Sequence, residues 1–253
     1  MKILEYGDKA KRKIILIHGF QSPVKLWDSY IEHFKNDYHI IIPIITGHDP
    51  EKNEDFISFA EEARQIEDFC LSSFGDDIYA IYGMSMGGVL TAVIGQNGRL
   101  KPKKLIFDGS PLYFPMKKAV ANIQKGFYLN VTHKTKHKDT KTLNQARQFV
   151  PERIYDEFIG IVSAMSDKTI ENCIMGITGF DIAHSGNYHG AELYYFHGTR
   201  SSEALARLSA KRMKKLYPRT VVRRFEGKGH CENAMFAPEI MITELEKIFA
   251  VRE

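Results

Sequence analysis

Short apolar runs rich in β-branched residues recur along the chain, with amphipathic stretches between them. The runs cover residues 13–19, 38–46, 77–83, 103–109, 191–198 and 220–227. Most of them are continuous rather than alternating, which is typical of strands buried on both faces of a parallel sheet. Helical patterns lie between them at 54–74, 86–98, 202–217 and 238–250. This order predicts an α/β fold with a mostly parallel central sheet flanked by helices.

The alternation stops between residues 111 and 187, where no run has the pattern of a strand. Helical patterns at 115–129, 140–150, 151–165 and 167–180 are separated there by Pro, Gly and Ser-Asp signals. We therefore expect residues 1–110 and 188–253 to form one α/β core. Residues 111–187 would form a helical cap inserted into that core.

The composition is that of one large globular domain. The chain has 253 residues, of which 43% are hydrophobic and 26% charged, enough for a sizeable core. Its three cysteines are far apart and form neither a disulfide framework nor a CxxC metal pattern, so we expect a reducing compartment. The first residues lack the apolar stretch of a secretion signal, and no later run is long enough for a membrane span. These features indicate a cytoplasmic protein.

The charge is mild overall but uneven. A net charge of +4 does not by itself indicate nucleic-acid binding, and nothing in the sequence determines the oligomeric state. Residues 116–150 include eight Lys and Arg residues but only one acidic residue, Asp139. Such a run is most often a solvated face, although it can also steer an anionic substrate. His133 and His137 lie four residues apart in this segment, but no further ligand completes a metal site, so we expect none.

The candidate chemistry centres on one motif. Gly83-Met84-Ser85-Met86-Gly87 matches G-x-S-x-G and stands between a strand pattern and a helix pattern, as that motif requires. A sharp turn would hold Ser85 in a strained conformation, with the glycines clearing space on either side. The Ser85 hydroxyl would then be the nucleophile, and the Met86 amide would face the negative charge that develops on the substrate.

A serine nucleophile needs a base and a second oxyanion donor. Among the ten histidines, His230 lies in a glycine-flanked loop after the last predicted strand, where parallel strands end together. The donor would be the Phe20 amide, which follows His18 and Gly19 after the first predicted strand. We expect His18 to brace this loop rather than to transfer protons.

These motifs occur in the order found in a known superfamily. "LIHGF", Trp27, "PIITGHD", "GMSMGG" and "GKGH" together resemble the α/β-hydrolase superfamily, most of all small bacterial esterases and acyl hydrolases with a helical cap. The resemblance implies a catalytic triad with Ser85 on a nucleophile elbow and His230 as the base. It also implies an oxyanion hole of the Phe20 and Met86 amides, and no cofactor or metal.

The triad's acid is ambiguous. In the superfamily the acid usually lies three residues after a glycine that corresponds to Gly198 in this chain. Here Ser201 occupies that position. One replacement is Asp108 at the end of a predicted strand, a position where some superfamily members carry their acid. The other is Glu203, which can also be read as a first-turn helix carboxylate. We favour Asp108 and keep Glu203 as the alternative.

The function expected from this resemblance is that of a serine hydrolase acting on a carboxylic ester or thioester of a small or medium acyl group. This would be a carboxylesterase or lipase-like enzyme of the EC 3.1.1 type, whose partner is a small-molecule acyl substrate. The alternatives are amide or carbon–carbon bond hydrolysis by the same triad, or a non-catalytic binding protein with this fold. A dehalogenase is disfavoured, because that chemistry uses a carboxylate where Ser85 stands. Candidates to line an acyl pocket are Phe127, Tyr128, Phe149, Phe158, Met165 and Met175.

Overall fold

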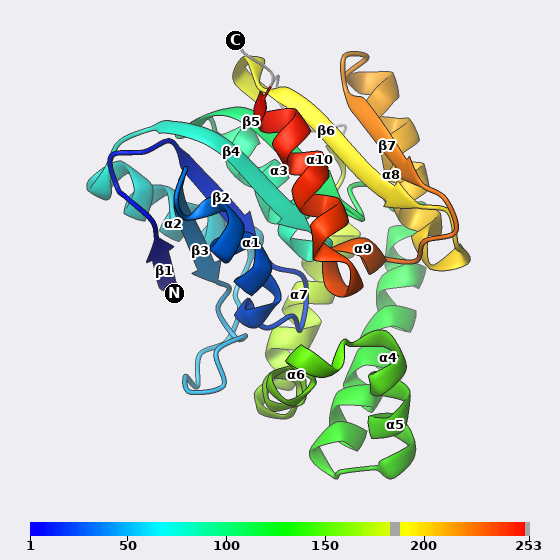
Figure 1. Ribbon diagram of the computed structural model, residues 1–253. Helices are drawn as coiled ribbons and strands as arrows, with labels where there is room; N and C mark the ends of the chain where they lie inside the picture. The colour runs from blue at the N-terminus through cyan, green and yellow to red at the C-terminus, as the bar shows by residue number, and fades with distance from the viewer. Residues whose placement is uncertain (183–187, 251–253) are drawn as a thin grey trace.

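A seven-stranded sheet forms the centre of the molecule in the computed structural model, which describes residues 1–182 and 188–250 (Figure 1). Its strand order is β1-β3-β2-β4-β5-β6-β7, with β1 antiparallel to β3 and every other neighbouring pair parallel. The predicted α/β architecture with a mostly parallel sheet is therefore confirmed. The strands are β1 (Lys2–Tyr6), β2 (Lys13–Ile17), β3 (His39–Ile44), β4 (Asp77–Met84), β5 (Lys101–Asp108), β6 (Glu192–Gly198) and β7 (Val221–Phe225).

Strand β2 shows why the central runs are apolar at every position. Ile15 and Ile17 pack into one hydrophobic core, whereas Ile14 and Leu16 pack into a second core on the opposite face. Both faces of the sheet are covered by helices, so neither set of side chains meets water. The helices of the core are α1 (Asp28–Phe34), α2 (Phe59–Ser73), α3 (Met86–Asn97), α8 (Ala204–Leu216), α9 (Glu232–Phe236) and α10 (Pro238–Ala250).

Four further helices connect β5 to β6 and extend beyond the carboxyl ends of the strands (Figure 1). They occupy the stretch for which the sequence predicts helices without strands: α4 (Lys117–Lys136), α5 (Thr140–Phe149), α6 (Glu152–Ala164) and α7 (Asp167–Gly179). An antiparallel bridge joins Tyr113 to Asp181, and the Ile182 N–H donates to the Leu112 carbonyl at 3.0 Å. The two ends of the segment that connects β5 to β6 therefore lie side by side next to the core. The last five residues of the predicted cap, 183–187, lie outside the described residues.

Strand β1 is the element that the sequence analysis missed. Its first residue is exposed and the other four are only partly buried, and it pairs with β3 at the edge of the sheet. A five-residue edge strand has no long apolar run to mark it, so only its tertiary pairing identifies it.

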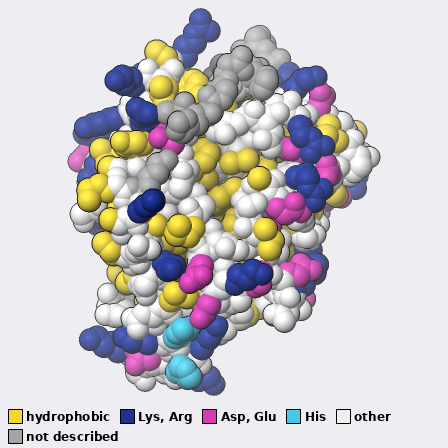
Figure 2. Space-filling view, turned by 180° about the vertical axis from the view of Figure 1, so that it is seen from behind, with side chains coloured by type: hydrophobic (Ala, Val, Ile, Leu, Met, Phe, Trp, Pro, Cys, Tyr) yellow, Lys and Arg dark blue, Asp and Glu magenta, His cyan; other side chains and the backbone are white. Residues whose placement is uncertain are grey.

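Within the described residues, no helix combines the length and the hydrophobicity that crossing a membrane requires. The face seen from behind the sheet carries hydrophobic side chains near its middle, bordered by charged ones (Figure 2).

Candidate active site

Ser85 occupies a strained turn between β4 and α3. Strand β4 ends at Met84 and helix α3 begins at Met86, so a single residue reverses the direction of the chain. Ser85 has φ 52° and ψ −115°, a conformation that residues with a side chain adopt rarely. The strain that the motif predicts is therefore present in the backbone of this structure.

The glycines of the motif leave room for this turn. A Cβ atom on Gly83 would overlap the Thr91 hydroxyl. A Cβ on Gly87 would overlap the Ile17 carbonyl and lie 2.7 Å from the His18 carbonyl. Helix α3 thus begins directly against the end of β2, which only a residue without a side chain allows.

His230 lies beside Ser85 although the two are 145 residues apart in sequence. It stands in the loop between β7 and α9, and its Nε2 is 2.9 Å from Ser85 Oγ. The His230 backbone N–H donates to Ser202 Oγ at 3.2 Å, which fixes this loop against the segment after β6. The structure therefore brings together the two residues that the sequence analysis selected.

Glu203 contacts the other side of the same imidazole. Its Oε1 lies 2.6 Å from His230 Nδ1, and its Oε2 accepts the Gly198 N–H at 2.8 Å. The side chain is only 1% exposed, so each carboxylate oxygen is used by a donor that offsets part of the cost of burial. Glu203 immediately precedes α8, but its carboxylate turns toward the strand ends instead of capping that helix.

Asp108, the acid that we favoured, is not in this position. It ends β5 and is buried, and its Oδ2 accepts a 2.8 Å hydrogen bond from the Tyr82 hydroxyl. Among the described contacts, none is a hydrogen bond between the Asp108 carboxyl and His230. The geometry thus reverses our order of preference, because Tyr82 on the neighbouring strand takes up the Asp108 carboxyl while Glu203 reaches the imidazole.

Burial also perturbs the Asp108 carboxyl itself. Loss of hydration raises its pKa from the ordinary 3.8 to about 7, and the nearby Glu203 carboxylate raises it as well. The hydrogen bond from Tyr82 and the proximity of His230 act in the opposite direction. The carboxyl groups of Asp108 and Glu203 therefore both lie near His230 but in different environments, and of the two only Glu203 is hydrogen-bonded to the imidazole.

The loop after β2 lies against Ser85. A Cβ on Gly19 would come 3.3 Å from Ser85 Cβ, and Phe20 lines the same cavity as Ser85. On the other side of the serine, Met86 is the first residue of α3, so its N–H has no acceptor in a preceding turn. The two amides expected to stabilise an oxyanion thus belong to the two segments that flank Ser85.

His18 braces this loop. Its Nδ1 lies 2.8 Å from the Gly19 carbonyl, and its Nε2 accepts the Ile45 N–H at 3.1 Å. Burial lowers the pKa of His18 to about 4, so the ring is neutral at pH 7 and Nε2 is free to accept. These contacts agree with the bracing role expected from the sequence.

A cavity of about 170 Å³ opens above Ser85 and His230 between the core and the helices after β5. Of the six lobe residues proposed from the sequence, only Tyr128 lines it. Phe127, Phe149 and Met175 are exposed, whereas Met165 is buried and Phe158 packs into the core. The lining residues that the sequence analysis missed come from four separate segments: Gly109, Pro111, Phe114, Gln124, Ile174, Ile177, Ser202, Leu205 and Ala206.

The basic segment lies on α4 and α5, and part of its charge is paired. Lys125 lies 3.6 Å from Glu171, and Arg147 lies 2.6 Å from Glu152. His133 Nε2 is 2.9 Å from an Asp167 carboxylate oxygen at the surface. In the described part of the chain, no three histidine, cysteine or acidic side chains are grouped as metal ligands.

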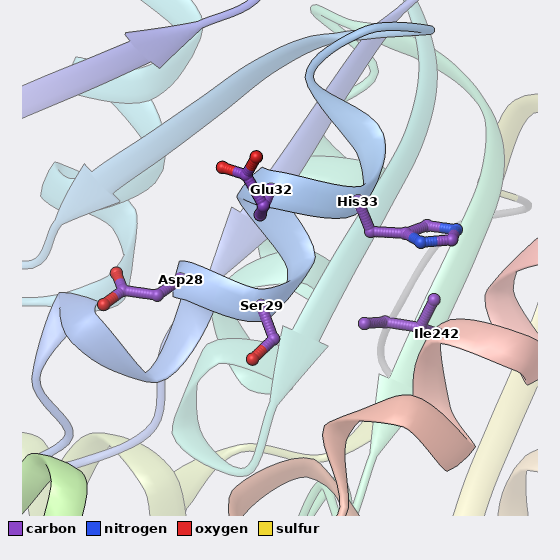
Figure 3. A pocket seen from close by; sticks show the side chains of 5 residues that line it. All are labelled: Asp28, Ser29, Glu32, His33 and Ile242. Atoms are coloured by element: carbon purple, nitrogen blue, oxygen red, sulfur yellow. The ribbon is translucent and has the colours of Figure 1, made fainter.

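A second surface depression lies between α1 and α10, away from Ser85 (Figure 3). His33 projects from α1 to the side where Ile242 of α10 lies, and Asp28, Ser29 and Glu32 of α1 also line the depression. His33 Nε2 lies 2.8 Å from Glu246, and no described contact links it to the Ser29 hydroxyl. This serine and histidine therefore do not form a nucleophile–base pair.

Comparison with known proteins supports the fold over nearly the whole chain. No protein-family model matches the sequence, and no curated protein matches it at the sequence level. An α/β hydrolase family protein from Desulfitobacterium hafniense superimposes with a TM-score of 0.74 at 19% identity, covering 98% of this chain and 100% of the other. A carboxylesterase from Nitrososphaera gargenis gives 0.78 at 16% identity, covering 98% and 93%.

An esterase from Exiguobacterium antarcticum gives a TM-score of 0.76 at 15% identity, covering 98% of this chain and 95% of the other. The strand order, the strained serine between β4 and α3, and these superpositions agree with one another. The chain therefore has the α/β-hydrolase fold.

Proposed function

We propose that this protein is a serine hydrolase that cleaves a carboxylic ester or thioester of a small or medium acyl group. The observation that carries the proposal is one continuous chain of contacts, in which Ser85 Oγ lies 2.9 Å from His230 Nε2 and His230 Nδ1 lies 2.6 Å from Glu203 Oε1. A nucleophile, a base and a group that orients the base are the three parts that acyl transfer through a serine requires.

The acylation step follows from this arrangement. His230 Nε2 takes the hydroxyl proton of Ser85 as Oγ attacks the carbonyl carbon and the carbonyl π electrons move to oxygen. Glu203 accepts the hydrogen bond from Nδ1–H, which holds the tautomer with a free Nε2 lone pair. Its negative charge also stabilises the imidazolium that forms, and burial of Glu203 strengthens this effect because water screens it little.

The carbonyl oxygen becomes negative in this step and needs donors. We assign that role to the backbone N–H groups of Phe20 and Met86, on the two segments that flank Ser85. Both amides are already placed by the fold before the charge appears, so they need little reorganisation. A single donor of this kind contributes about 10²–10³-fold to kcat in serine hydrolases.

Deacylation repeats the chemistry with water as the nucleophile. The imidazolium first gives its proton to the departing alcohol or thiol, and the neutral His230 then takes a proton from water as it attacks the acyl-enzyme. The carbonyl re-forms as the bond to Ser85 Oγ breaks, and the serine recovers its proton. The residues assigned here complete this cycle without a metal or an organic cofactor.

The comparisons support this class of reaction only through the fold that they share. The structures from Nitrososphaera gargenis and Exiguobacterium antarcticum are described as a carboxylesterase and an esterase, at identities of 16% and 15%. The fold alone does not fix the chemistry, so the argument rests on the contacts of Ser85, His230 and Glu203.

A fluorophosphonate probe combined with a panel of acyl esters and thioesters tests the proposal. We expect the folded protein to be labelled at Ser85, and Ser85→Ala to abolish both labelling and hydrolysis while the circular dichroism spectrum stays unchanged. Ser29→Ala is the matched control, because Ser29 lies in the depression next to His33 without a base in contact. Folded protein that neither labels nor hydrolyses any acyl substrate would sink the proposal.

A further inference from the structure

We propose that the acyl group taken by this site is short and carries a second, uncharged oxygen, which Gln124 and Tyr128 of helix α4 recognise. This inference rests on the proposed hydrolase function and adds the class of its substrate. It follows from the size of the cavity, from the residues that line it, and from two side chains on one face of α4 that have no hydrogen-bond partner among the described residues.

The size of the cavity limits the acyl group. Its volume is about 170 Å³, and it lies between the core on one side and α4 and α7 on the other, with an opening to solvent. A cavity of roughly 150 Å³ in another protein holds one benzene molecule, so this space suits a group of about six carbon atoms. A long fatty acyl chain would therefore leave most of its length outside this space, in contact with water.

The cavity is lined mostly by apolar side chains, so the few polar side chains among them indicate which polar groups a substrate would carry. Phe114, Ile174, Ile177 and Leu205 contribute carbon surface around the serine. Gln124 places an amide among them, is half-buried, and has no hydrogen-bond partner within the described residues. A ligand that fills this space would displace water from the Gln124 amide, and an oxygen on the ligand would replace the hydrogen bonds lost with that water.

Tyr128 lies one helical turn further along α4, so it shares a face with Gln124. Its ring packs edge-on against Phe20 of the oxyanion loop, with centroids 5.1 Å apart. Burial raises the pKa of the Tyr128 hydroxyl, and no described group accepts from or donates to it. Two neighbouring donors of the cap helix are therefore left for a ligand, close to the loop that would hold the carbonyl.

The chemistry of these groups selects the class of oxygen. The amide N–H of Gln124 and the hydroxyl of Tyr128 can both donate to a keto oxygen, and the amide carbonyl can accept from a hydroxyl. No lysine or arginine lines the cavity in the described residues, so a carboxylate or phosphate would enter without a counter-charge. The structure thus favours an oxo- or hydroxyacyl group over a plain or an anionic one.

Binding to the Ser85→Ala protein tests the inference without hydrolysis. Methyl hexanoate would be titrated against methyl 3-, 4- and 5-oxohexanoate by NMR chemical-shift perturbation. We expect at least one oxo ester to bind about tenfold more tightly than the plain ester, the gain expected of one buried hydrogen bond. Adding Gln124→Leu or Tyr128→Phe should remove most of that preference, whereas Gln145→Leu on the exposed surface of α5 should leave it intact.

The same pairs of esters would be hydrolysed by the wild-type enzyme, and kcat/KM compared. Preferential binding without any hydrolysis would overturn the proposed function but leave the inference standing. Hydrolysis with equal kcat/KM for oxo and plain esters, unchanged by Gln124→Leu, would overturn the inference alone. Preference for decanoate over hexanoate esters would also contradict it, since a cavity of this volume cannot enclose the longer chain.

Discussion

The Nδ1 atom of His230 lies 2.6 Å from Oε1 of Glu203, a carboxylate that the chain provides five residues after Gly198 at the end of β6. The second oxygen of Glu203 is held by the Gly198 amide, so the carboxylate is fixed by the strand that delivers it. Asp108, on the neighbouring strand, is bonded to Tyr82 instead. This division of contacts between the two carboxyl groups leads to different predictions for their removal.

Replacement of Glu203 by glutamine should damage catalysis severely. The glutamine amide can present an N–H to His230, which would favour the tautomer whose Nε2 carries the proton and cannot accept one from Ser85. We expect kcat of the proposed hydrolase to fall by about 10³–10⁴-fold, as when the triad acid of known serine hydrolases is replaced. Asp108→Asn is the matched comparison and should have a far smaller effect. An Asp108→Asn enzyme impaired as strongly as Glu203→Gln would contradict the assignment.

The Asp108 carboxyl should make stability depend on pH. Its pKa is about 7 in the folded protein against the ordinary 3.8, so between these values the folded chain holds a proton that the unfolded chain has lost. The free energy of unfolding therefore falls as the pH rises through this window, by about 1.4 kcal/mol per pH unit from this group. Below pH 4 and above pH 7 its contribution is constant.

Urea unfolding at pH 5 and pH 7.5 would measure this effect. Wild type should lose more stability between the two pH values than Asp108→Asn, whose side chain cannot ionise but still accepts the Tyr82 hydrogen bond. Glu62→Gln on α2 removes a second buried carboxyl whose pKa burial also raises, so it should reduce the pH dependence in the same direction. Parallel pH profiles of wild type and Asp108→Asn would show that the carboxyl is ionised throughout.

The close approach of α3 to the loop after β5 predicts a different kind of sensitivity. A Cβ on Gly88 would overlap Ser110 Oγ and lie 2.5 Å from Ser110 Cβ, so Gly88→Ala must displace the helix or the loop. We expect a loss of about 1–3 kcal/mol in unfolding free energy, as for other overpacked cores. Gly160→Ala in α6, with no atom within 4 Å of the new Cβ, should instead stabilise by about 0.5–1 kcal/mol. Equal effects of the two changes, measured by chemical denaturation, would contradict this interpretation.

The sequence predicts those parts of the structure that depend on local pattern. Ser85 lies in a short motif, and the sequence on either side of it shows the pattern of the strand that precedes the turn and of the helix that follows it. The inner strands found by their apolar runs are buried on both faces, which is why their pattern is continuous, whereas β7 at the edge of the sheet is mostly exposed. His230 could be selected because glycines and a strand end mark its loop.

The acid and the cavity depend on tertiary contacts, and this explains the errors. Asp108 ends β5 and Glu203 follows β6, and the carboxyl ends of these neighbouring parallel strands lie side by side, so the sequence places both carboxyl groups near His230. Which of them turns toward the imidazole is decided by Tyr82, two residues before the end of its own strand and directly beside β5. The cavity lining likewise depends on which face of α4 turns inward, which exposes Phe127 and leaves its neighbour Tyr128 partly buried against the core.

A buried hydrogen bond between helix α4 and the loop after β2 predicts that these two segments act together. Gln21, the residue after Phe20, donates through Nε2 to Thr132 Oγ1 at 3.2 Å, although the two are 111 residues apart. Gln21 also adopts a left-handed backbone with φ 59°, which costs a residue with a side chain free energy. We infer that the hydrogen bond to α4 helps to hold the loop, and with it the Phe20 amide, in this conformation.

Two substitutions separate the effect of the Gln21–Thr132 hydrogen bond from that of the strained Gln21 backbone. Thr132→Val removes the acceptor and leaves the buried Gln21 amide without that partner, and we expect kcat to fall about tenfold, a fraction of the loss of a whole oxyanion donor. Gln21→Gly relieves the strain but also removes the hydrogen bond, so it should lower kcat by a similar factor even if the protein becomes no less stable. The double variant should then be no worse than either single one, because both changes remove the same contact. A Thr132→Val enzyme that unfolds at lower urea concentration with unchanged kcat would show that the contact only fastens the cap.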